Sequence, residues 1–132
     1  MFNLLLVFGD WGITFLRVVL GLIMFVHGKS KIKSLKKTGE GFETMGFRPG
    51  IFWATVVTIV EFLGGLFLIF GFLTQVVAFV LAIQFLVILF TVKRKAAFQG
   101  GLEFDLLILA VALALMVLGS GNLSIDRMFF GF

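Results

Sequence analysis

The chain lacks several residues on which common chemistries depend. It has no cysteine among its 132 residues, which excludes a disulfide, a thiol redox relay, an iron–sulfur cluster and a cysteine-based zinc site within the chain. Its single histidine, His27, excludes a haem held by two histidines of one chain. The sequence has no metal-ligand spacing, no glycine-rich phosphate loop and no nucleophile beside a base. We therefore expect no metal site and no soluble catalysis.

Charge is also scarce. Charged residues make up 14% of the chain and apolar residues 61%, whereas soluble domains are about 25% charged and about 45–50% apolar. The chain has too few polar residues to cover a water-exposed surface, and its nineteen phenylalanines suit lipid contact. With only one proline and no low-complexity tract, a disordered or fibrous chain is not expected. The composition predicts an integral membrane protein.

Four apolar stretches are long enough to approach the about 20 residues that a helical span requires. They cover residues 11–28, 52–72, 76–92 and 102–118. A shorter apolar stretch, 2–8, is interrupted by Gly9-Asp10 and is expected to lie at the interface. No basic residue precedes it, so a signal peptide is not expected. Short connections make neighbouring helices antiparallel, and we predict an all-α fold, an integral membrane antiparallel four-helix bundle, formed by residues 1–132 as one domain.

The basic residues are distributed unevenly between the connections. Segment 29–50 carries six Lys or Arg residues and segment 93–95 carries three, whereas the opposite side carries only Arg127. The positive-inside rule places both basic connections in the cytoplasm and both termini outside. Anionic lipid is the natural partner of these residues, so nucleic acid is not expected. Ile32 and Leu35 interrupt the lysines at helical spacing, which predicts a short amphipathic interfacial helix.

Ionisable residues inside the spans are few and costly. They are Arg17, Glu61, Glu103 and Asp105. Each costs about 2.5–3.5 kcal/mol at the centre of a membrane helix, so they should face the bundle and find partners. Estimated depths place the backbones of Arg17 and Glu61 several ångströms apart, a distance that an arginine side chain can cover, and Gln84 lies at a similar depth. This predicts one polar layer contributed by three helices. One interpretation of the layer is an ion pair with an amide that sets helix register. The other is a polar site that binds the head group of a ligand or carries a proton in quinone chemistry.

A second polar group is expected at the inner ends of the first and fourth spans. His27 ends the first span, and Glu103 and Asp105 open the fourth. Antiparallel packing would bring these ends to one level, where Lys31 is able to join them. Acids in the first turn of a helix also favour the positive end of its dipole, so the alternative interpretation of Glu103 and Asp105 is simple helix caps. His27 is either a hydrogen-bonded anchor or a group that exchanges protons near neutral pH.

Small residues mark the faces of the first two spans. Gly64 and Gly65 follow Glu61 at helical spacing and share its face. Together with Gly21 they allow close helix packing, or they leave room for a flat ligand.

Several short motifs now stand in a recognisable order. In the first span they are Leu16-Arg17, Leu20-Gly21 and His27-Gly28, followed by a lysine-rich loop. The second span has Glu61-Phe62-Leu63-Gly64-Gly65 and then Gly71-Phe72-Leu73-Thr74. The fourth span and tail have Gly101-Leu102-Glu103-Phe104 and residues 119–126. Together these motifs resemble the DoxX family along nearly the whole chain.

The resemblance implies a four-helix protein of a bacterial or archaeal cytoplasmic membrane. Some members of this family are small subunits of a thiosulfate:quinone oxidoreductase, others join membrane-associated oxidoreductase assemblies in redox-stress defence, and many have no assigned activity. Arg17, His27, Glu61 and Glu103 match recurrent family positions. With Gln84, which enters through its depth in the third span, they are the candidate ligand-binding or proton-relay residues.

Three functions follow from this sequence. The first is a membrane subunit of a quinone-linked oxidoreductase, which anchors the complex and contributes to a quinone site. The chain has no evident electron carrier, so we expect no intrinsic cofactor and a quinone at a site shared with a partner that brings flavin, haem or metal. The second is a non-catalytic structural or accessory subunit of a transport, motility or respiratory assembly. A carrier or channel is weaker, because no span is broken. Expected partners are lipid and other membrane or membrane-associated subunits, and homo-oligomerisation is open.

Overall fold

The computed structural model describes residue 5 and residues 7–93 and 97–131. Its helices are α2 (Gly9–Lys33), α3 (Leu35–Thr44), α4 (Gly50–Phe70), α5 (Thr74–Val87) with its π-helical continuation η1 (Ile88–Val92), η2 (Phe98–Leu102), α6 (Glu103–Leu118) and α7 (Ile125–Phe130). The described residues contain no strand. The predicted interfacial segment 2–8 falls largely outside the described residues.

Within the described residues, four helical segments are long and apolar enough to cross a membrane. They are Gly9–Lys33, Gly50–Phe70, Thr74–Val92 and Phe98–Leu118. The shortest has 19 residues, which corresponds to about 28 Å at about 1.5 Å per residue. The predicted all-α fold with four spans is confirmed. The first helix continues five residues beyond the predicted boundary at residue 28, because lysines are good helix formers and can extend their ammonium groups towards water.

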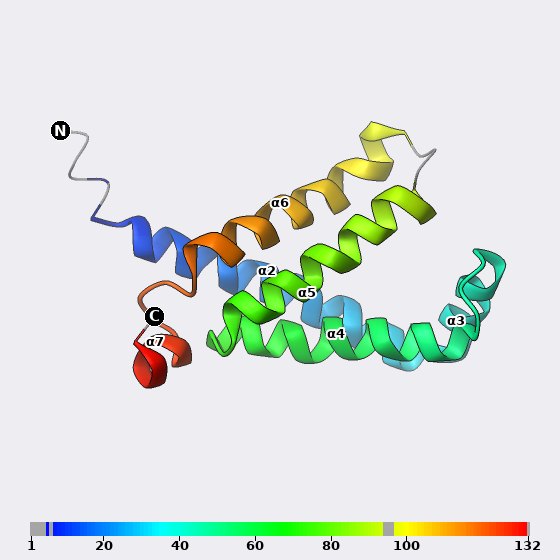
Figure 1. Cartoon of the computed structure of the whole chain (residues 1–132), viewed down its shortest axis with the longest axis horizontal. Helices are drawn as coiled ribbons and strands as arrows, with labels where there is room; N and C mark the ends of the chain where they lie inside the picture. The colour runs from blue at the N-terminus through cyan, green and yellow to red at the C-terminus, as the bar shows by residue number, and fades with distance from the viewer. Residues whose placement is uncertain (1–4, 6, 94–96, 132) are drawn as a thin grey trace.

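The helices form two antiparallel pairs, α2 with α4 and α5 with α6 (Figure 1). Glycines allow the first pair to pack backbone against backbone. A Cβ atom added at Gly28 would lie 2.4 Å from the Phe62 backbone nitrogen, and one added at Gly65 would lie 2.4 Å from that of Phe25. A Cβ atom added at Gly21 would lie 2.8 Å from the Ile69 backbone nitrogen. The packing interpretation of Gly21 and Gly65 is therefore confirmed, while Gly64 faces Val77 of α5.

The pairs join through a tight turn between α4 and α5. Gly71 ends α4 with φ +70°, and Phe72 N donates to Phe67 O at 2.8 Å, the pattern of a Schellman cap. The carboxylate of Asp126 accepts from the backbone nitrogens of Leu73 (2.6 Å) and Thr74 (2.8 Å). The C-terminal segment therefore fastens this turn from outside the four spans.

The two ends of the bundle differ in character. The start of α2 and the whole of α7 lie at one end, where Arg127 pairs with Asp10 at 3.1 Å. The other end carries α3, η1 and η2 (Figure 1). Segment 29–50 and Lys93 share this end, as predicted for the basic connections, whose Arg94 and Lys95 lie outside the described residues. The helix α3 is the short helix expected in segment 29–50, although Ile32 belongs to α2.

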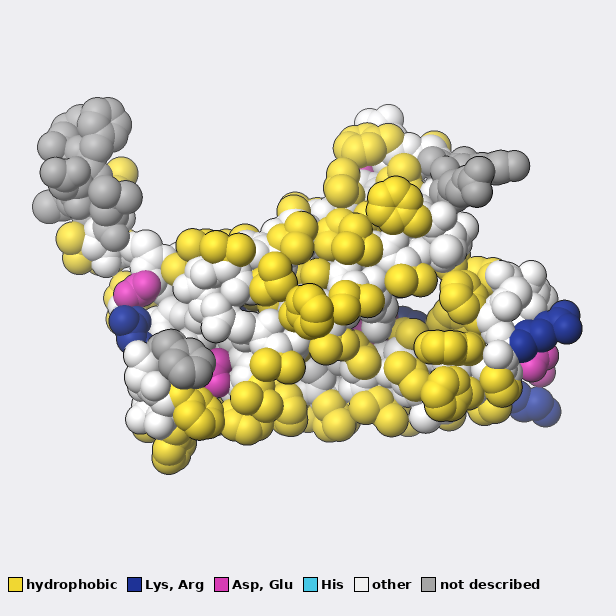
Figure 2. Space-filling model, viewed as in Figure 1, with side chains coloured by type: hydrophobic (Ala, Val, Ile, Leu, Met, Phe, Trp, Pro, Cys, Tyr) yellow, Lys and Arg dark blue, Asp and Glu magenta, His cyan; other side chains and the backbone are white. Residues whose placement is uncertain are grey.

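Small and aliphatic side chains fill the centre of the bundle. Met24, Leu68, Leu81 and Leu115 are almost completely buried between the two pairs. Large apolar side chains cover the outer surface, as Figure 2 shows for one face. Burial inside the bundle and apolar exposure outside are expected when lipid is the solvent.

Candidate functional site

Arg17 lies at the end of the bundle that holds α7. Its guanidinium is almost fully buried, with 2% of the residue exposed. Nη1 donates to Ser120 O, and Nη2 donates to Leu123 O at 2.6 Å. These carbonyls belong to the segment after α6, which has left helical hydrogen bonding and needs donors. Arg17 therefore ties the C-terminal segment to α2.

The predicted layer of Arg17, Glu61 and Gln84 is wrong for Arg17. Its two terminal nitrogens bind the carbonyls after α6, whereas Glu61 binds Lys31 and Gln84. The prediction compared only the depths of side chains in the membrane. It did not consider the backbone carbonyls after α6, which are nearer acceptors for the guanidinium of Arg17.

Glu61 is the centre of the polar layer that the structure does contain. Only 3% of the residue is exposed. Gln84 Nε2 of α5 donates to Glu61 Oε1 at 2.9 Å, and Lys31 Nζ of α2 donates to Oε2 at 2.6 Å. Both carboxylate oxygens are thus occupied, by two different helices. The layer joins three helices as predicted, with Lys31 in the place expected for Arg17.

Lys31 was missed as a partner of Glu61 for a reason of register. Gly28 packs against Phe62, so the next turn of α2 lies beside Glu61 and carries Lys31. The glycines in the sequence indicate a close contact between these helices without saying which residues face each other. Gly28 and Gly65 indicate the close contact in the sequence, but the sequence does not show how α2 is aligned along α4.

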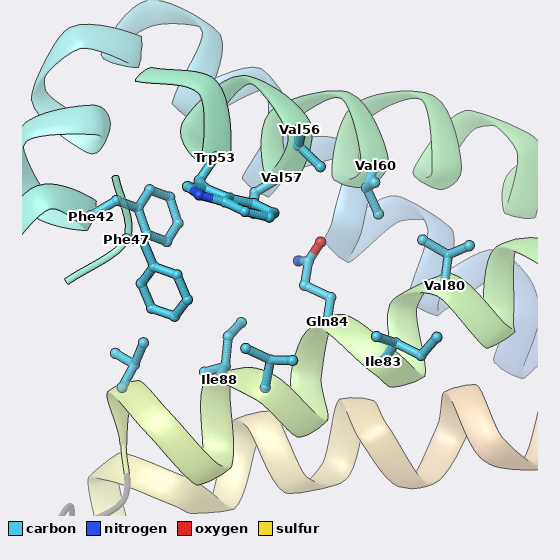
Figure 3. Close-up of a pocket in the computed structure, with 12 residues that line it drawn as sticks. Phe42, Phe47, Trp53, Val56, Val57, Val60, Val80, Ile83, Gln84 and Ile88 are labelled. Atoms are coloured by element: carbon cyan, nitrogen blue, oxygen red, sulfur yellow. The ribbon is translucent and has the colours of Figure 1, made fainter. Parts of the chain in front are cut away.

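An apolar cleft lies beside this polar layer, between α4 and the end of α5 with η1. Its cavity volume is about 420 Å³. Phe42, Phe47 and Trp53 form its wall near α3, and aliphatic side chains of α4, α5 and η1 complete it. Gln84 is the one lining residue with a side-chain amide, and Figure 3 shows it pointing from α5 towards α4 between the walls. In Figure 2 the cleft is a hollow between the α3 end and the arm formed by α5.

The cleft therefore combines three properties of a site for an amphipathic ligand. Its walls are apolar, its rim is aromatic, and its floor carries an amide that is held by a buried carboxylate. Such a site suits a flat ring with polar substituents and an apolar tail.

The second predicted cluster, at the ends of α2 and α6, is only partly assembled. The ring of His27 stacks on Phe104, with centroids 5.9 Å apart, so these helix ends do lie at one level. His27 Nδ1 is 2.7 Å from Ile23 O, which matches the interpretation as a hydrogen-bonded anchor.

The acids of α6 bind elsewhere. Glu103 Oε1 accepts from Gly100 N at 3.0 Å, and Asp105 forms an ion pair with Lys93. Glu103 therefore binds a backbone N–H of η2, ahead of α6, and Lys31 pairs with Glu61 and does not join His27. In the parts of the chain that the structure describes, no group of three or more His, Asp and Glu side chains is placed to hold a metal ion.

Comparison with known proteins places this architecture in a family. A family model described as DoxX matches residues 12–94, more than half of the chain. The chain belongs to the DoxX family. The part matched by the DoxX model contains Arg17, His27, Glu61 and Gln84, and Glu103 lies beyond it.

Two curated relatives extend the comparison. The chain is 37% identical over 119 residues to "Putative oxidoreductase CatD" of Bacillus subtilis (strain 168), covering 90% of this chain and 87% of the relative. It is 33% identical over 122 residues to "Inner membrane protein YqjF" of Escherichia coli (strain K12), covering 90% of this chain and 92% of the relative. No solved structure matches significantly. With four candidate spans, this member of the DoxX family is an integral membrane protein.

Proposed function

We propose that this DoxX-family chain is the membrane subunit of a quinone-linked oxidoreductase complex. It anchors the complex in the cytoplasmic membrane of a bacterium or archaeon and holds the quinone ring in the cleft above Gln84. The observation that carries the proposal is the apolar cleft with an amide at its floor. The relative from Bacillus subtilis, whose name contains the word oxidoreductase, supports the reaction class.

The chemistry of the cleft suits a quinone in particular. A side-chain amide nitrogen has two N–H donors, and Gln84 directs one of them to Glu61. The second N–H is then available to a ring carbonyl. Phe42, Phe47 and Trp53 offer apolar faces against which a flat ring packs, and an isoprenoid tail leaves between α4 and α5 towards lipid.

The electrons come from a partner in this proposal. The chain has no cysteine and one histidine, so a reduced flavin, haem or metal centre of a partner subunit is the electron donor. In this proposal the basic connections face the cytoplasm, as the positive-inside rule predicts, and the cleft beside α3 then lies in the cytoplasmic half of the membrane. A partner that docks on the cytoplasmic side therefore reaches the quinone directly.

Tryptophan fluorescence tests the proposal in the isolated chain. The chain has two tryptophans, and Trp53 lines the cleft. A Trp11→Phe variant leaves Trp53 as the single reporter, and a short-tailed quinone is titrated into nanodiscs that contain it. We expect saturable quenching, because a ring above Gln84 contacts the indole.

Two further variants make the result specific. Val57→Phe fills part of the cleft, and we expect it to weaken the affinity for quinone by about tenfold or more, which corresponds to about 1.4 kcal/mol. Val117→Phe, on an exposed face of α6, is the matched control and should leave the affinity unchanged. Quenching that rises linearly with quinone, or that ignores Val57→Phe, would refute the site and leave a non-catalytic accessory subunit as the function.

A further inference from the structure

A chain of polar contacts crosses the α4 layer from the cleft to the far side of the helix pair. It begins at Gln84 in the cleft, passes through the carboxylate of Glu61 and ends at Lys31. Side-chain exposure rises along it, from 4% at Glu61 to 27% at Lys31. The buried acid thus has a cation on its other oxygen that reaches the surface.

Few other charged groups surround the contacts between Gln84, Glu61 and Lys31. Glu61 is the only ionisable residue of α4, and α5 has none. On α6, Glu103 and Asp105 bind Gly100 N and Lys93. On α2, His27 directs Nδ1 to Ile23 O and its ring to Phe104. Among the described residues, Lys31 is therefore the charged group in contact with Glu61.

We propose that Lys31 supplies protons to the quinone in the cleft through Glu61. The inference rests on the proposed function and adds a residue and a direction to it. An ammonium group can lose a proton and regain it, and Lys31 is exposed enough to regain it from water. Glu61 alone is too buried to exchange protons with water directly.

The step balances as follows. The quinone would take two electrons from the reduced flavin, haem or metal centre of the partner. The proton for the carbonyl held by Gln84 starts on Lys31. An N–H bond of Lys31 breaks as an O–H bond forms on Glu61. That O–H bond then breaks as the quinone O–H bond forms through one bridging water beside Gln84, because Glu61 itself does not line the cleft. The opposite carbonyl takes its proton from interfacial water at the cleft mouth, and water restores the Lys31 ammonium.

Substitution by arginine separates proton supply from charge pairing. Arginine keeps the positive charge and the ion pair with Glu61, yet it does not give up a proton in proteins. If Lys31 only holds Glu61 in place, Lys31→Arg should react like the wild type. If Lys31 supplies protons, both Lys31→Arg and Lys31→Met should fail. Lys33→Arg, on an exposed lysine of the same helix, is the matched control.

The experiment reduces the bound quinone in nanodiscs with dithionite, which is oxidised to bisulfite as quinol forms. The rate of quinol formation and the dissociation constant from Trp53 quenching are measured on the same samples, in H₂O and D₂O. We expect the wild-type rate to fall in D₂O, and Lys31→Arg to be slower than wild type by about 100-fold with an unchanged dissociation constant. Lys33→Arg should match the wild type.

The outcomes separate the two proposals. All variants carry Trp11→Phe, and absence of saturable quenching with Lys31 intact refutes the quinone site and the proton supply with it. Normal quenching together with a wild-type rate in Lys31→Arg refutes the proton supply alone. Loss of folding in Lys31→Met is controlled by Lys31→Met/Glu61→Gln, a neutral pair that should regain stability and remain slow.

Discussion

Replacing Gly65 with alanine tests whether close contact between α2 and α4 holds the bundle together. An added Cβ would lie 2.4 Å from Phe25 N and 2.7 Å from Gly21 O, both backbone atoms of α2. Ordinary contact between heavy atoms requires about 3.5–4.0 Å, so the helices must separate by about 1 Å. Neither obstacle is the tip of a flexible side chain, so the strain cannot be relieved by a change of rotamer.

The expected loss of stability follows from two opposing terms. Overpacking of a close contact costs about 1–3 kcal/mol, and a backbone obstacle belongs at the upper end. Alanine favours the helix over glycine by about 1 kcal/mol. We therefore expect Gly65→Ala to lower the free energy of unfolding by about 2 kcal/mol.

Unfolding by SDS in mixed micelles, followed by circular dichroism, measures this change. Gly12→Ala is the control, because an added Cβ at this position of α2 meets no atom within 4 Å. It should be as stable as the wild type or slightly more stable. Equal stability of Gly65→Ala and Gly12→Ala would refute the reasoning that backbone contact between the helices is tight.

Two further predictions concern the outer end and the orientation. Arg17→Met leaves the two carbonyls that the guanidinium binds without their donor. Hydrogen bonds to charged groups contribute about 1.5–3 kcal/mol each, so we expect the free energy of unfolding to fall by about 3 kcal/mol in the same SDS titration. A fall below about 1 kcal/mol would contradict this reasoning. Since the chain has no cysteine, a cysteine at exposed Met128 should react with an impermeant maleimide in intact cells, and one at Gly41 only after permeabilisation; the reverse pattern would overturn the orientation.

The spans and the interfacial helix were predictable because their signal is local. Apolar runs of the required length define the four spans. The spacing of Ile32 and Leu35 among lysines indicates helix in this connection but not the break at Ser34, which leaves Ile32 in α2 and Leu35 in α3. The contact of Glu61 with Gln84 was also within reach, since both residues lie near the middle of neighbouring helices and a buried carboxylate needs a donor.

The rest of the site depends on information that a single sequence does not contain. Depth along a helix is one coordinate, and Arg17 was assigned by depth alone. Its partners are backbone carbonyls after α6, which no side-chain pattern reveals. The contact of Lys31 with Glu61 depends on the alignment of α2 against α4, and that alignment is set by backbone packing at Gly28 and Gly65.

The apolar walls of the cleft have a practical consequence for handling the protein. A detergent tail is chemically similar to an isoprenoid tail, and the cleft walls between α4 and α5 make no distinction between the two. Any affinity measured in micelles is then a competition against detergent at millimolar concentration. The tail length and concentration of the detergent should shift the apparent dissociation constant of a quinone, whereas nanodiscs replace that competitor with the lipid that the protein meets in its membrane.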